Sequence, residues 1–168
     1  MVLLARPRSN HGRVISVGSP PQRRTALSAP ARVLVVANRT ADSEEVLAAL
    51  LERAQRGAIE VTVLTPATWE VVDPHGGVQS ARRRLRAALT RLRGAGVSAT
   101  GVVGDADPFL AVEAIWDPER FDEIVVATLP QHVSRWLRLD LPPRLERLTG
   151  RSVRHVIASE RTPALRGI

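Results

Sequence analysis

Five runs of apolar residues recur along the chain from residue 32 onward. The first, Arg32 followed by Val-Leu-Val-Val-Ala, has no alternation of polar and apolar positions, which is typical of a strand covered on both faces. The pattern predicts strands at 32–37, 59–65, 97–103, 123–128 and 152–158. Strands buried in this way belong in parallel sheets, where a long crossover must join each strand to the next.

Residues at helical spacing fill the intervals between these runs. Asp42 with Glu45 resembles a capping box for a first helix that ends near Gly57. Three further helices are expected to open at Ser80, at Asp107 with Pro108, and near Pro142 with Pro143. Strand and helix therefore alternate. This predicts an α/β fold, a single doubly wound domain with a five-stranded parallel sheet and helices on both faces.

The distribution of charge divides the chain into a domain and two tails. The net charge is +7, and all 24 basic residues are arginine. Residues 1–30 hold five arginines, no acid and no sustained apolar period, so we expect a disordered basic tail. Residues 31–159 carry 17 arginines against 16 acids and form the expected domain, and residues 160–168 form a flexible C-terminal tail. An alternative is that the true start lies downstream of residue 30.

Composition also narrows the class of protein. The chain has no cysteine, which excludes a disulfide framework, a thiolate metal site and thiol catalysis. Its apolar runs are far shorter than the ~20 residues that a membrane span needs, so we expect no membrane segment and a cytoplasmic location. The absence of lysine excludes a Walker loop. The chain therefore lacks the residues that most enzymes with this fold use for catalysis. The sequence favours a protein that is not an enzyme.

Three segments of the chain resemble the universal stress protein family. They are RVLVVANRT at 32–40, VVGDADP at 102–108 and EIVVATLPQHVSRW at 123–136. In element order and length, the resemblance covers roughly residues 31–158. It implies a domain of the adenine-nucleotide-binding α/β superfamily, with a regulatory or stress-response role.

The phosphate-binding motif of that family is degraded in this chain. Members that bind ATP carry Gly-x2-Gly-x9-Gly-Ser/Thr after the fourth strand; on that spacing the glycines fall at Thr128, Gln131 and Leu141, and Pro142 replaces the Ser/Thr. Asn38 stands where the family has an acidic residue after the first strand. Side chains then occupy the space of the phosphates, and Pro142 lacks an amide donor. The resemblance implies ATP or another adenine nucleotide as cofactor, and the degraded motif predicts that ATP binds weakly.

Polar residues cluster in the loops that follow three of the predicted strands. Ligands of doubly wound sheets bind beyond the carboxyl ends of the strands, so these loops form the expected ligand-binding site. The candidate residues are Asn38, Arg39, Thr40, Gly104, Asp105, Thr128, Gln131, His132, Ser134 and Arg135.

Two other readings of these loops were considered. Asp105 and Asp107 have the carboxylates of a cation site, but a turn residue and a helix cap explain them, and no metal site is assigned. His132, Ser134 and Asp140 are the residue types of a hydrolase triad. They lie in one loop without a Gly-x-Ser-x-Gly elbow, so no catalytic residue is assigned.

The second predicted helix is rich in arginine. Opposite its leucine stripe, these residues are interpreted as a solvated face: Arg82, Arg83, Arg84, Arg86, Arg91 and Arg93. Nucleic acid is not the favoured partner, because no aromatic platform lies between the arginines.

The sequence as a whole favours a non-catalytic, universal-stress-protein-like regulatory or stress-response protein that binds a nucleotide or related small molecule weakly. Two alternatives stay open. One is a protein interaction module with a vestigial pocket, which forms a homodimer through an exposed sheet edge. The other is a nucleic-acid-binding protein that acts through its basic tail.

Overall fold

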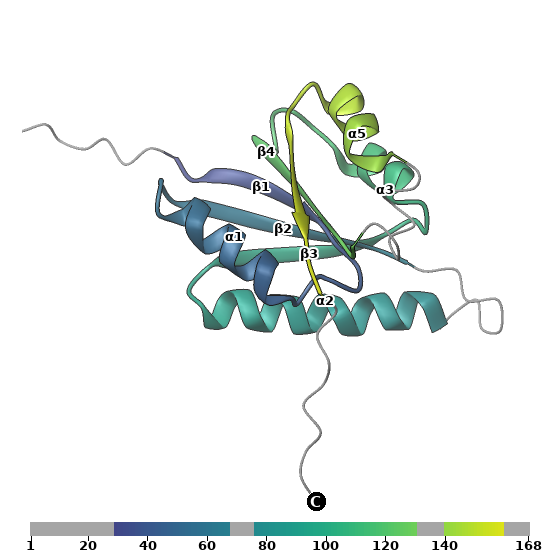
Figure 1. Ribbon diagram of the computed structural model, residues 1–168, viewed down its shortest axis with the longest axis horizontal. Coiled ribbons are helices and arrows are strands. Elements are labelled where there is room, and N and C mark those ends of the chain that lie inside the picture. The colour runs from purple at the N-terminus through teal and green to yellow at the C-terminus, as the bar shows by residue number, and fades with distance from the viewer. Residues whose placement is uncertain (1–28, 68–75, 131–139, 160–168) are drawn as a thin grey trace, which may run out of the picture.

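The computed structural model describes residues 29–67, 76–130 and 140–159, in which strands and helices alternate (Figure 1). In chain order the elements are β1 (Ala31–Val36), α1 (Glu44–Ala54), β2 (Ile59–Pro66), α2 (Gly76–Gly94), β3 (Ser98–Gly104), α3 (Pro108–Ile115), β4 (Glu123–Thr128), α5 (Leu141–Thr149) and β5 (Val153–Ile157). Nearly all of the expected N-terminal tail and the whole expected C-terminal tail lie outside the described residues. Within the described ranges, no helix has the length and apolarity that crossing a bilayer requires.

The five strands form one sheet in the order β3-β2-β1-β4-β5, and all neighbouring pairs are parallel. The chain moves outward from β1 to β3, then returns to the other side of β1 for β4 and β5. Helices α1 and α2 cover one face of the sheet and α3 and α5 cover the other (Figure 1). The predicted doubly wound α/β fold is confirmed. The crossovers diverge between β1 and β4, which is the place where such sheets open a crevice.

The core consists of two apolar layers, one on each face of the sheet. Alternate residues of β1 contribute to opposite layers, because side chains along a strand point to opposite faces. Val33 and Val35 join the layer under α1 and α2, and Leu34 and Val36 join the layer under α3 and α5. All four are fully buried. Burial on both faces explains why the first strand is a continuous apolar run.

Two helices begin at residues other than those predicted. Helix α1 is capped by Ser43 rather than Asp42, and the Ser43 hydroxyl accepts a hydrogen bond from the amide of Val46 at 3.2 Å. Helix α2 begins at Gly76, four residues before the expected Ser80. Glycine is a poor helix former, so helix propensity did not predict the first turn of α2, which begins with Gly76 and Gly77.

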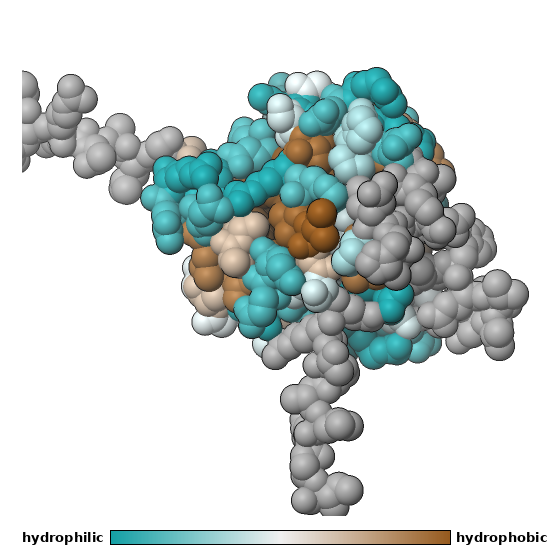
Figure 2. Space-filling view, in the orientation of Figure 1, coloured by the Kyte–Doolittle hydropathy of each residue, from teal (hydrophilic) through white to brown (hydrophobic). Residues whose placement is uncertain are grey.

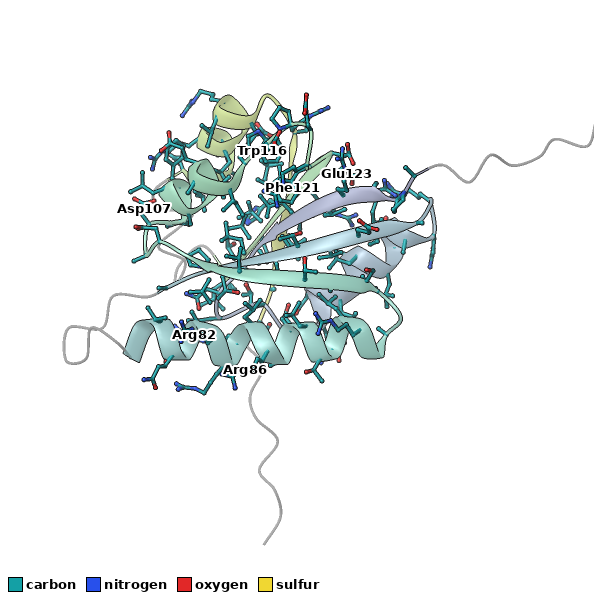
Figure 3. All side chains as sticks on the ribbon, turned by 180° about the vertical axis from the view of Figure 1, so that it is seen from behind. Arg82, Arg86, Asp107, Trp116, Phe121 and Glu123 are labelled. Carbon is teal, nitrogen blue, oxygen red and sulfur yellow. The ribbon has the colours of Figure 1, made fainter. Side chains whose placement is uncertain are left out.

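The connection between α3 and β4 is fixed by side chains at both ends. Trp116 and Phe121 stack with their ring centroids 5.8 Å apart, and Figure 3 shows the two rings beside α3. At the start of β4, the carboxylate of Glu123 accepts hydrogen bonds from Arg53 of α1, at 2.8 Å from Nε. These contacts hold the start of β4 against helices on opposite faces of the sheet.

Candidate functional site

Asn38 directly follows β1 and lies at the centre of a hydrogen-bond network. Only 7% of the residue is exposed. Its Nδ2 donates to the carbonyl of Pro66 at the end of β2, and its Oδ1 accepts from Nη1 of Arg84 on α2, both at 2.7 Å. The network joins the ends of two neighbouring strands to the helix that covers them. Both ends of the Asn38 amide are thus engaged within the protein.

Thr40 joins the loop after β1 to strand β4. The residue is buried, and its hydroxyl donates to the carbonyl of Ala127 on β4 at 3.0 Å. Arg39, between Asn38 and Thr40, is exposed. The loop after β1 is therefore fixed by its two buried polar residues, and Arg39 is its solvent-facing side chain.

Thr128 is the last residue of β4. It is buried, and its Oγ1 lies 2.7 Å from Nε2 of His155 on β5. Burial lowers the pKa of His155, because desolvation disfavours the charged imidazolium. Sequence reasoning assigned His155 no role at the site. The contact depends on the pairing of β4 with β5, which aligns Thr128 with Ile157 and which no local pattern reveals.

Gly104 and Asp105, the candidates after β3, have structural roles. A Cβ at Gly104 would lie 2.8 Å from Cβ of Ala111, so glycine allows α3 to pack closely against the strand. The carboxylate of Asp105 accepts from the amide of Asp107 at 2.8 Å, and Asp107 caps α3 through the amide of Phe109 at 2.8 Å. The interpretation of these acids as a turn residue and a helix cap is confirmed. In the described ranges, no group of His, Cys, Asp or Glu side chains is arranged to hold a metal ion.

Helix α5 begins where the family motif places its last glycine. Leu141 is almost completely buried and packs in the layer under α3 and α5. Asp140 at the N-cap has a left-handed backbone, with φ of 49°, and makes no side-chain capping bond. Pro142 removes one of the first amide donors of the helix. This helix start is built for packing and lacks the backbone donors of a phosphate cradle.

Four of the candidates lie outside the described residues. They are Gln131, His132, Ser134 and Arg135. The structure brings together the loops that contain Asn38, Thr40 and Thr128 around the divergence of β1 and β4. Gly104 and Asp105 lie two strands away, at the end of β3.

Arg84 is a residue of this edge that sequence reasoning placed on a solvated face. The structure corrects that prediction for Arg84 and for Arg91, which are both partly buried, the second in an ion pair with Glu44. Arg82 and Arg86 are exposed residues of α2, as predicted, and Figure 3 labels both on that helix. A helical wheel places Arg84 at the border of the leucine stripe, but the strand that this border faces depends on the sheet order.

The fold and the polar carboxyl edge define a doubly wound α/β protein, and comparison with solved structures narrows this class. The chain is similar to a universal stress protein from Archaeoglobus fulgidus, with a TM-score of 0.57 and 15% identity over 75% of this chain and 93% of that chain. It is also similar to a universal stress protein family protein from Arabidopsis thaliana with AMP bound, with a TM-score of 0.56 and 14% identity over 81% and 97% of the two chains. A universal stress protein in complex with cAMP matches with a TM-score of 0.54 and 22% identity, over 79% of this chain and all of that chain.

These similarities establish a universal-stress-protein-like fold. No protein-family model and no curated protein sequence matches the chain. The predicted resemblance is thus confirmed at the level of the fold.

Proposed function

We propose that the protein is a non-catalytic regulatory or stress-response protein of the cytoplasm, which binds an adenine nucleotide or a related small molecule. The ligand occupies the carboxyl edge of the sheet, between the loops after β1 and β4. This is the function that the fold and the polar residues of that edge support best.

One observation carries the proposal. Three of the buried polar residues, Asn38, Thr40 and Thr128, lie at the carboxyl ends of β1 and β4, where the crossovers diverge. Structures with this fold have been solved with AMP, dAMP and cAMP bound. Because Leu141 and Pro142 replace the glycine cradle, we expect ATP to bind weakly. The expected dissociation constant is in the high micromolar range or weaker, which corresponds to a binding free energy above about −6 kcal/mol.

The proposal is tested by titrating ligand-free, isotopically labelled protein with AMP and ATP and following the backbone amides by NMR. We expect AMP to shift the amides of Asn38, Thr40 and Thr128. The control amides are those of Gly57 and Gly96, which lie in the turns before β2 and β3 at the opposite edge of the sheet. Shifts that are absent, or that appear at the control edge, would contradict the proposal.

A second candidate function is an interaction module that forms a homodimer through β5. This edge strand carries Ile157, which is 58% exposed. Figure 2 shows a hydrophobic patch bordered by hydrophilic residues where β5 crosses the front of the molecule in Figure 1. Sedimentation of the wild type and of Ile157→Glu tests this function. The matched control is Leu110→Glu, at an exposed leucine of α3. A wild-type protein that stays monomeric at all concentrations would exclude it.

A further inference from the structure

The guanidinium of Arg84 is held at the ligand edge by a neutral partner. Its Nη1 donates to Oδ1 of Asn38 at 2.7 Å, and the amide of Asn38 is itself fixed by the carbonyl of Pro66. The carboxyl ends of β1 and β2 thus determine where the cation lies. Asn38 is a positioning residue in this arrangement, because both polar ends of its side chain are used within the protein.

The positive charge of Arg84 has no carboxylate partner among the described residues. Helix α2 contains no acidic residue, and its other partly buried arginine, Arg91, is paired with Glu44. A guanidinium is always charged and presents several N–H groups in a planar fork, which matches the oxygens of a phosphate. Arg84 uses one of these groups on Asn38. A partly desolvated cation in this state gains from an anion that completes its contacts.

Among the described residues, the start of α5 offers few donors to an anion. Pro142 lacks an amide donor, and the side chain of Leu141 is buried. Arg84 on α2 is a donor that remains available to an anionic group of the ligand.

We propose that Arg84 forms an anion-recognition subsite, and that the ligand of this edge carries a phosphate group that docks on Arg84 beside the ends of β1 and β2. This inference rests on the proposed function for the location of the ligand, and it adds the chemical class of the ligand and the residue that selects it. The base or other neutral part of the ligand then lies toward the divergence of β1 and β4.

Calorimetry with AMP and adenosine tests the selection, since the two ligands differ only in the phosphate. A charge-assisted bidentate contact predicts that AMP binds about tenfold to hundredfold more tightly than adenosine. We expect Arg84→Gln to reduce this ratio to about one. The matched control is Arg82→Gln, which removes the same charge from an exposed arginine of the same helix. It should leave the ratio unchanged.

A second variant guards against a loss of folding in Arg84→Gln. Asn38→Asp supplies a carboxylate at the position of the bound amide oxygen, so it should pair with Arg84 and abolish the preference for AMP while leaving the cation in place. Thermal unfolding of each variant, followed by circular dichroism, reports whether the fold is intact.

Inorganic phosphate is the probe that separates this inference from the proposed function. If phosphate shifts the Arg84 Nε–H signal but neither AMP nor adenosine binds more tightly than phosphate, the subsite stands and the proposed nucleotide function fails. If AMP and adenosine bind equally, the subsite is refuted and the proposed function stands. The subsite is also refuted if Arg82→Gln lowers the AMP preference as much as Arg84→Gln, or if none of the three probes binds.

Discussion

Asp122 connects the loop before β4 to the start of β1, and replacing it with asparagine gives a quantitative test of the fold. Its Oδ2 accepts from the backbone amide of Arg32 at 2.9 Å and from Nε at 3.0 Å, and its Oδ1 accepts from Nη2 at 2.9 Å. These hydrogen bonds from Arg32 lower the pKa of Asp122 from 3.8 to about 2. Asp122→Asn keeps the shape of the side chain and removes the charge.

The magnitude follows from that pKa. One pKa unit corresponds to ~1.4 kcal/mol. The lowering of the Asp122 pKa from 3.8 to about 2 therefore contributes at most about 2.4 kcal/mol to the free energy of unfolding. Both side chains are 40% exposed, so solvent screening reduces the contribution to about 1 kcal/mol. In a domain of this size, we expect Asp122→Asn to lower the midpoint of thermal unfolding by about 3–5 °C at pH 7.

The dependence on pH has a defined sign. The folded-state pKa of Asp122 is below the unfolded value, so its stabilisation is complete above about pH 5 and is lost as the pH falls toward 2. Urea unfolding of wild type and variant between pH 2.5 and pH 7 measures the difference in the free energy of unfolding. We expect that difference to fall to about half of its neutral value near pH 3. A difference that is independent of pH would refute the electrostatic reasoning and assign the effect to packing.

Two further predictions concern Gly104, a predicted site residue, and Leu141, which stands at the last glycine position of the family motif. Gly104→Ala should lower the free energy of unfolding by about 1–3 kcal/mol, because the new Cβ would lie 2.8 Å from Cβ of Ala111. The control is Gly94→Ala, which has open space around the new Cβ and should be neutral or stabilising in the same urea assay. Leu141→Ala should lower the free energy of unfolding by about 2–4 kcal/mol, because it leaves a cavity in the core. Leu110→Ala, at an exposed position, should lower it much less. Equal effects of the two substitutions would contradict the buried position of Leu141.

Local patterns were sufficient to predict the elements of this fold. A continuous apolar run identified β1, because this central strand is covered on both faces of the sheet. The edge strands β3 and β5 include exposed polar residues such as Thr100 and Arg154 and were identified by shorter apolar runs. Asp107 with Pro108 identified the start of α3, because the cap is made by the residues themselves. The error at the start of α1 occurred because two neighbouring residues can serve as the cap. Asp42 and Ser43 are both good capping residues, and only the backbone conformation at Ser43 decides between them.

The site was less predictable, because its contacts join residues that are distant in sequence. Asn38 and Arg84 are 46 residues apart, and Thr128 and His155 are 27 apart. Their encounters depend on which strands are neighbours and on which face each helix covers. The alternation of strands and helices limits that order to a few possibilities but does not select one. A residue such as Arg84 is therefore indistinguishable from Arg82 until the sheet order is known.

Several residues that the sequence analysis discussed, as site candidates or as positions of the family motif, have structural roles. Gly104 allows α3 to approach β3, Asp105 closes a turn, and Leu141 fills the core, so the folding of the chain already accounts for these three residues. Asn38 differs from these residues, because folding alone does not require a buried amide at the end of a strand. A capping residue, a turn residue or an apolar residue would be sufficient there. Instead it uses its whole amide to hold a cation at the edge. An apolar residue of similar size would avoid the cost of burying the amide, and the proposed anion subsite accounts for that cost, because Asn38 fixes the position of Arg84.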